Sequence, residues 1–188
     1  MKKSLAASLV FHRHRLRIIT RWGLVAFLAT AAPAFAQTTV WTDGTANWFN
    51  PANWSAGVPD ANTSALINNG GTAQIMSSGA VASGVELGVE VQDSGTLSTS
   101  GSGNLQGGGS VYVGRSGTGS VSITSGGVVS SGRFVIGENS GSNGTATVSG
   151  SGSMWMNVAV CFVGFDGNGT LNITSGGQLS NLNSTSIG

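Results

Sequence analysis

The chain is poor in charged residues, and most of the basic ones lie at one end. It has 188 residues, of which eight are Lys or Arg, seven are Asp or Glu, and two are His. Six of the eight basic residues and both histidines lie within the first 21 positions. Residues 37–188 therefore have no histidine and no lysine, and two arginines against seven carboxylates give them a net charge of −5.

These absences exclude several kinds of function for residues 37–188. Without histidine or lysine, the segment cannot form a Ser-His-Asp triad, a His-ligated metal site or a lysine Schiff base. Two arginines cannot form the basic surface that nucleic-acid binding requires. The single cysteine, Cys161, allows neither an intrachain disulfide nor a cysteine zinc site. We therefore expect no catalytic residue, no metal and no cofactor in this segment.

Residues 1–36 have the pattern of a cleaved secretory signal peptide. Basic residues precede an apolar run at 22–32, which is shorter than the roughly 20 residues that a membrane span needs. Ala34 and Ala36 supply the small residues that signal peptidase recognises, so cleavage is expected before Gln37. The alternative is an uncleaved membrane anchor. Cleavage predicts a mature chain that leaves the cytoplasm.

Residues 61–188 consist of similar units that recur at nearly even intervals. One marker is a short strand that ends in glycine, and it occurs five times: Gly88, Gly114, Gly137, Gly164 and Gly188. A second marker is a strand that begins with glycine, and it follows each of the first four at a similar offset: Gly95, Gly119, Gly144 and Gly169. Apolar side chains alternate with polar ones after each marker, which is typical of β-strands with one buried face.

The repeat predicts an all-β fold, a parallel β-helix or solenoid with coils of about 25 residues. A single unit is too small to bury its own apolar row, so units must stack and form ladders of equivalent residues. A disordered Gly/Ser linker is the alternative, because Gly, Ser, Thr and Asn make up 84 of the 152 residues from 37 to 188. Roughly five coils about 4.8 Å apart are expected. The last coil would leave a pairing edge uncovered, so we expect that the sequence is part of a longer parent chain.

Between the signal and the repeats, residues 37–60 are rich in tryptophan. Trp41, Trp48 and Trp54 lie six or seven residues apart. Large aromatic side chains suit a cap over the open end of a solenoid core. The alternative is a ligand site, because tryptophan rings also stack on sugars. The domain organisation expected is a signal peptide at 1–36, a tryptophan-rich cap at 37–60 and solenoid repeats at 61–188.

Four further features have a structural and a functional interpretation. Cys161 aligns with Val111 and Phe134, which predicts an inward apolar position rather than a reactive thiol. Asp166 lies in a turn that resembles part of a calcium loop, but the equivalent turns have no carboxylate. A third feature is an acidic cluster, expected on a solvated outer face rather than as a glycosidase pair: Glu86, Glu90 and Asp93. The fourth is an outward row that could be a contact surface: Tyr112, Val135 and Phe162.

The tryptophan block and the glycine-marked repeats together resemble the passenger region of bacterial autotransporter proteins. The segment 150–157, which contains Ser153, Trp155 and Asn157, is similar to a variant coil of those passengers. The resemblance implies a right-handed β-helix, exported by a Gram-negative bacterium and anchored by a C-terminal outer-membrane barrel. No barrel strands follow the repeats in this sequence.

The expected function is therefore structural and adhesive, at the cell surface or outside the cell, without catalysis. Expected partners are host-cell or extracellular polysaccharide and protein surfaces, with no nucleic acid, and contact with a membrane only through the barrel. Two alternatives stay open. One is a secreted carbohydrate-binding module using the three tryptophans, and the other is a polysaccharide-active enzyme on the same fold whose catalytic residues lie beyond Gly188.

Overall fold

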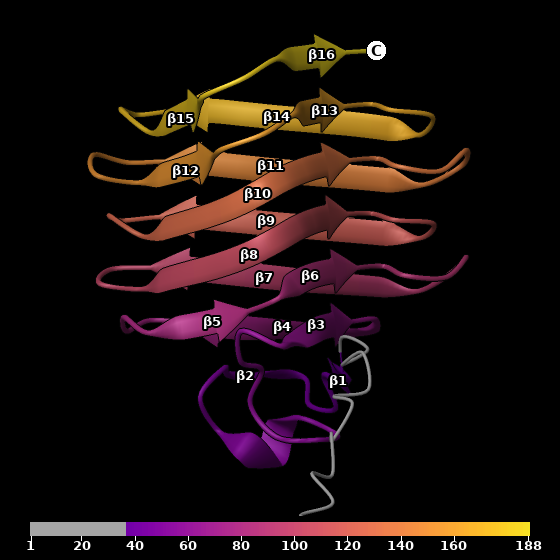
Figure 1. The fold of residues 1–188 in the computed structure, drawn as a ribbon, viewed down its shortest axis with the longest axis vertical. Coiled ribbons are helices and arrows are strands. Elements are labelled where there is room, and N and C mark those ends of the chain that lie inside the picture. Colours follow the sequence, from indigo (N-terminus) through magenta and orange to yellow (C-terminus); the bar gives the residue numbers. More distant parts are fainter. Residues whose placement is uncertain (1–36) are drawn as a thin grey trace, which may run out of the picture. The chain divides into compact units, whose positions relative to one another are not determined.

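Residues 37–188, which the computed structural model describes, form an all-β parallel solenoid (Figure 1). The chain winds in successive coils, and each strand pairs in parallel with its equivalent in the next coil. The predicted fold class is confirmed. The predicted signal peptide, with Ala34 and Ala36, lies outside the described residues, whereas Gln37 is the first residue of a strand.

The strands belong to two sheets, on different sides of the solenoid. The larger has ten strands: β1 (Gln37–Val40), β3 (Thr63–Ile67), β5 (Ala80–Ala82), β6 (Gly84–Leu87), β8 (Asn104–Val113), β10 (Val128–Ile136), β12 (Met154–Asn157), β13 (Cys161–Val163), β15 (Gln178–Asn181) and β16 (Thr185–Ile187). The smaller has six: β2 (Thr45–Asn47), β4 (Asn69–Ile75), β7 (Ser94–Ser100), β9 (Thr118–Thr124), β11 (Asn143–Ser149) and β14 (Asn168–Thr174).

The strand register follows the repeat in the sequence. In the smaller sheet, Gly119 pairs with Gly95 on one side and with Gly144 on the other, and Gly144 pairs with Gly169. In the larger sheet, a continuous inward ladder joins equivalent positions of five coils: Val85, Val111, Phe134, Cys161 and Thr185. Both predicted markers therefore identify residues that lie one above another in the stack.

The two marker glycines of a coil lie close together in space, because the backbone makes a tight turn between them. Gly114 ends the first strand of a coil with a φ of 72°, a left-handed conformation that favours glycine. A Cβ on Gly119, at the start of the next strand, would lie 2.0 Å from the Gly114 nitrogen. No side chain fits in that space, so this turn needs a glycine on both sides.

The smaller sheet has six levels, one more than the roughly five coils that the sequence predicted. The additional level is β2, which pairs with β4, while β1 pairs with β3 in the larger sheet. Both strands come from the tryptophan-rich segment 37–60. That segment therefore extends the two sheets in addition to supplying large buried side chains.

Coil length varies at one corner, between the two halves of β8 and β10. Ser131 pairs with Gly107 and Arg133 pairs with Ser110, so Gly108 and Gly109 lie opposite a single residue, Gly132. An extra residue in one strand is a β-bulge, which bends the strand and leaves residues unpaired. This corner accommodates part of the irregular repeat length without disturbing the ladders on either side.

Helical structure is almost absent from the described part of the chain. The single helical element among residues 37–188 is η1 (Pro51–Asn53), a 3-10 turn to which Asn50 provides a side-chain cap on the Ala52 nitrogen. Within the same residues, no helix has the length and apolar character needed to cross a membrane.

Candidate functional site

The three tryptophans of segment 37–60 lie in the interior at the N-terminal end of the solenoid. Trp41, Trp48 and Trp54 are 1%, 0% and 4% exposed, and all three belong to the hydrophobic core. The Trp54 ring lies edge-on to both others, with centroid distances of 4.9 Å to Trp41 and 4.8 Å to Trp48. Trp54 also donates its indole N–H to the Trp48 carbonyl at 2.8 Å. No ring face is open to a sugar in this conformation, so we do not place a stacking site there.

A different set of side chains is gathered on the outer face of β6, β8, β10 and β13. The outward row predicted from the alternation is present: Tyr112 pairs with Val135, and Val135 pairs with Phe162. Glu86 pairs with Tyr112 and extends the row by one coil. Phe165, in the turn after β13, packs against Phe162 with the ring centroids 4.9 Å apart. Val135 is only 2% exposed although it points outward, so large neighbouring side chains cover it.

Both arginines of the described segment lie beside this row. We use the name lateral strip for the outward side chains that they join: Glu86, Tyr112, Arg115, Arg133, Glu138, Phe162 and Phe165. Arg115 forms ion pairs with Glu86, one coil before it, and with Glu138, one coil after it, the latter at 3.3 Å between Nε and Oε2. The strip therefore connects three consecutive coils through side-chain charges.

Tyr112 lies at the centre of the lateral strip. Arg133 donates a hydrogen bond to the Tyr112 hydroxyl, and the guanidinium carbons of Arg115 and Arg133 lie 5.2 and 5.3 Å from its ring centroid. Cation–π contacts at this distance are worth about 0.5–1 kcal/mol at exposed sites. The arrangement holds both guanidinium groups in fixed positions at the surface.

Glu138 is a carboxyl group of the strip whose pKa is altered by its surroundings. Burial raises the pKa of its carboxyl above the usual 4.5, and the positive charges of Arg115 and Arg133 lower the pKa and partly oppose this effect. The Glu138 Oε2 and Arg133 Nε atoms are both buried. Within the described residues neither atom has a hydrogen-bond partner, although Glu138 Oε2 also forms the ion pair with Arg115. Unsatisfied buried polar atoms are uncommon in folded proteins, and a bound water or ion, local strain or a functional role can account for them.

We expect Arg115→Met to raise the pKa of Glu138 further, because it removes a nearby positive charge. The pKa of Glu138 is higher in the folded chain than in the unfolded one. There is therefore a pH range in which the folded chain keeps the proton on the Glu138 carboxyl and the unfolded chain has lost it. The free energy of unfolding should therefore fall as the pH rises above about 4.5 through the folded pKa, and the fall should be larger in the variant.

Carboxyl chemical shifts measured by NMR between pH 3 and pH 8 give this pKa directly, and denaturant unfolding across the same range gives the change in stability. Glu138→Gln in the Arg115→Met background is the control, because it removes the titrating group. An unchanged or lower pKa in Arg115→Met would show that Arg115 does not act on Glu138.

The acidic residues predicted on a solvated outer face have different surroundings, since Glu90 is exposed whereas Glu86 and Asp93 are half-buried. Glu86 instead faces Arg115, which brings it into the same strip as Glu138. Glu90 and Asp93 form a turn of their own, in which the Glu90 N–H donates to the Asp93 carboxylate at 3.0 Å. Closeness along the chain was a misleading guide to which charged residues meet, because residues that lie side by side in a solenoid are one coil apart in the sequence. The signal was present in the register, since Arg115 and Glu138 each follow the glycine that ends a strand.

The two other candidate residues, Cys161 and Asp166, lie in the core and in a surface turn. Cys161 is buried in the inward ladder, and this burial raises the pKa of its thiol to about 11, so the thiol stays protonated at neutral pH. Asp166 lies in the exposed turn before β14. Among residues 37–188, no three His, Cys, Asp or Glu side chains are grouped closely enough to hold a metal ion.

Comparison with protein-family models, with curated proteins and with solved structures gave no match to this chain. The lateral strip and the solenoid that carries it are therefore the basis for a functional proposal.

Proposed function

We propose that this chain is an exported β-solenoid passenger with a structural and adhesive role at the surface of a Gram-negative bacterium, without catalysis of its own. The predicted signal peptide supports export. The resemblance of its repeats to autotransporter passengers supports surface display, on the cell or released from it. The proposed partners are polysaccharide or protein surfaces outside the cell.

The lateral strip is the observation that carries this proposal. Tyrosine, tryptophan and arginine are the residues that most often dominate binding energy at interfaces. In the strip, both arginines contact the single tyrosine of the chain, and Phe165, which packs on Phe162 further along the strip, is 54% exposed. Paired strands hold these groups at fixed positions, which limits the entropy lost on binding.

Regular rows of polar side chains on the smaller sheet support the same role. Equivalent residues of six coils form one outward row of hydroxyls: Thr45, Thr72, Thr96, Ser120, Thr145 and Thr170. Rows of this kind repeat about every 4.8 Å along the stack. A partner with repeated polar groups can bind several of them at once, which strengthens weak individual contacts.

A polysaccharide-active enzyme is the second candidate, and one observation favours it. Glu86 and Glu138 approach the same arginine, and the pKa of Glu138 is raised. A carboxyl with a raised pKa can act as the general acid of glycoside hydrolysis when a second carboxyl lies nearby. The binding role is favoured because Arg115 is held between both carboxylates, which compensates their charge.

The test measures binding of the labelled, purified chain to the extracellular matrix of the producing bacterium and to animal and plant cell surfaces. We expect saturable binding that is weakened about 10-fold or more by the double variant Arg115→Met/Arg133→Met, since loss of a hot-spot contact costs about 2 kcal/mol. Glu90→Gln, a charge change outside the strip, is the matched control and should bind like the wild type.

The same samples separate binding from catalysis. Release of new reducing ends from the matrix, lost in Glu138→Gln, would favour the enzyme. Absence of binding to every surface, or binding unchanged in the double arginine variant, would overturn the adhesive proposal.

A further inference from the structure

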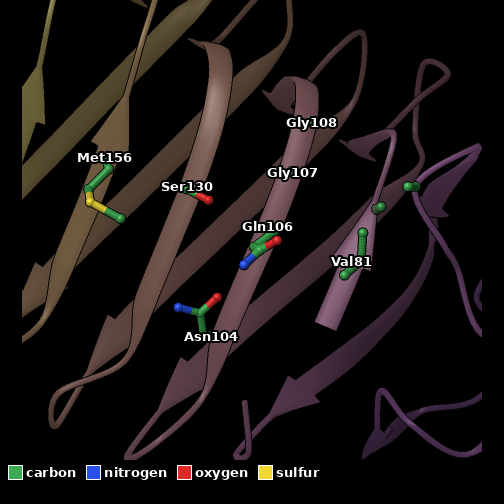
Figure 2. A pocket seen from close by; sticks show the side chains of 9 residues that line it. Val81, Asn104, Gln106, Gly107, Gly108, Ser130 and Met156 are labelled. Carbon is green, nitrogen blue, oxygen red and sulfur yellow. The ribbon is translucent and has the colours of Figure 1, made fainter. Parts of the chain in front are cut away.

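A groove of about 340 Å³ lies on the outer face of the larger sheet (Figure 2), and no side chain of the lateral strip lines it. Strands β5, β8, β10 and β12 supply most of its lining, and Ala61 before β3 completes one end. The lining residues from these strands are Val81, Ala82, Asn104, Gln106, Gly107, Gly108, Ser130 and Met156. The volume falls within the roughly 300–1,000 Å³ of small-ligand sites.

The groove is elongated along the solenoid axis because its lining comes from equivalent positions of successive coils. Val81 pairs with Gln106, Gln106 pairs with Ser130, and Ser130 pairs with Met156. Figure 2 shows these side chains on neighbouring strands. With strands about 4.8 Å apart, this row spans roughly 15 Å. A short chain of linked units fits that length better than a compact metabolite does.

The bulge in β8 contributes to the hollow. Gly108 is exposed and lies where the strand carries an extra residue relative to β10. A Cβ at this position would have one neighbour within 4 Å, the Ala82 carbonyl oxygen at 3.9 Å, and the backbone of Gly108 is not left-handed. The protein therefore tolerates a side chain here, but a larger one would project into the space that the ligand needs.

The polar groups of the groove are neutral and available. The side-chain amides of Asn104 and Gln106 make no hydrogen bond within the described residues, so each offers donors and an acceptor. Ser130 adds a hydroxyl, which donates to the Leu105 carbonyl and can still accept. Val81 and Met156 supply apolar contact at either side of these groups, and no charged side chain of the described residues lines the groove.

We propose that this groove binds a neutral glycan chain lengthwise along the solenoid axis. Sugar hydroxyls would exchange hydrogen bonds with Asn104, Gln106 and Ser130, while apolar C–H faces of the sugar rings would contact Val81 and Met156. This proposal rests on the adhesive function above and names a ligand class for it.

The lining argues against the two other extended ligands. An acidic glycan has no cation to bind, because Arg115 and Arg133 are not among the lining residues. A peptide strand binds mainly through backbone hydrogen bonds at an open sheet edge. The groove lies on a sheet face, and β8 and β10 are paired on both sides there.

The test uses an array of immobilised neutral and acidic glycans, probed with the purified chain and three variants. We expect the wild type to bind neutral glycans, and Gly108→Leu to abolish that binding by filling the groove. Asn104→Ala/Gln106→Ala should weaken binding about 10-fold or more, since each hydrogen bond contributes about 1 kcal/mol. Gly44→Leu is the matched control, because a Cβ on Gly44 meets nothing within 4 Å and Gly44 does not line the groove.

Circular dichroism and thermal unfolding of the same samples establish that Gly108→Leu is folded. If it is not, the double alanine variant decides the question. Binding restricted to acidic glycans, binding that these variants leave unchanged, or no binding to any neutral glycan would overturn the proposal. Matrix or cell-surface binding that persists in Gly108→Leu and is lost in Arg115→Met/Arg133→Met would leave the adhesive function standing without this groove.

Discussion

Replacement of Trp155 by alanine is expected to lower the free energy of unfolding by about 3–5 kcal/mol. Its side chain is fully buried and stacks on Phe134, with ring centroids 4.4 Å apart and planes 28° apart. Its indole N–H donates to the Ser131 hydroxyl at 3.1 Å inside the core. The substitution therefore leaves a cavity between coils and a hydroxyl that loses one of its partners.

Chemical denaturation followed by circular dichroism measures this effect. Met156→Ala is the control, because Met156 is the next residue, points outward and is 37% exposed. Trp155→Phe should retain more of the stability, because an aromatic ring still packs on Phe134. Equal stabilities of Trp155→Ala and Met156→Ala would contradict the position of Trp155 in the core.

Gly119→Ala is expected to destabilise the solenoid by more than about 3 kcal/mol, although it adds only a methyl group. The new Cβ would lie 2.0 Å from the Gly114 nitrogen and 2.7 Å from the Val113 carbonyl carbon. Both are backbone atoms, one at the end of β8 and one directly after it, so relief requires a shift of the coil rather than of a side chain. Gly144 and Gly169 face the same restriction one and two coils further along.

The matched control is Gly44→Ala, because a Cβ at Gly44 has no neighbour within 4 Å and its backbone is not left-handed. The midpoints of thermal unfolding of the two variants should differ widely, with the control close to the wild type. A Gly119→Ala chain as stable as the control would mean that the turn between the two strands of a coil is looser than described.

The fold was predictable because the sequence repeats two constraints in phase. Gly114 and Gly119 mark one turn of a coil, and the alternation after Gly119 places Val121 and Ile123 in the core. Equivalent residues in later coils repeat both signals, so the register followed from counting. The bulge within Gly107–Gly109 was not predictable, since several consecutive glycines give no side-chain pattern to fix which residue is unpaired.

Composition alone did not determine the role of the tryptophan-rich segment 37–60. Trp41, Trp48 and Trp54 can cover a core or stack on sugars, and their spacing suits both. Their positions depend on how β1 and β2 pair with the following coil, which brings Trp41 next to the Leu66 carbonyl, to which it donates its backbone N–H at 2.8 Å. Tertiary pairing places all three rings inside.

The lateral strip was only partly visible in the sequence. The row of Tyr112, Val135 and Phe162 followed from alternation, but the charges around it did not. Arg115 reaches Glu86 in the preceding coil and Glu138 in the following coil, and both are far from it along the chain. Such contacts depend on side-chain length and rotamer at the surface, which a pattern of apolar positions does not determine.

The central proposal is that the chain acts at the cell surface through its lateral strip. The most direct measurement compares attachment of the native bacterium with that of a strain lacking the gene, complemented with the wild type or with Arg115→Met/Arg133→Met. External protease digestion of intact cells, together with assay of the culture medium, confirms equal export of both forms. The account predicts that deletion abolishes attachment and that only the wild type restores it. Retention of the chain inside the cell, or unchanged attachment of the deletion strain, would contradict it.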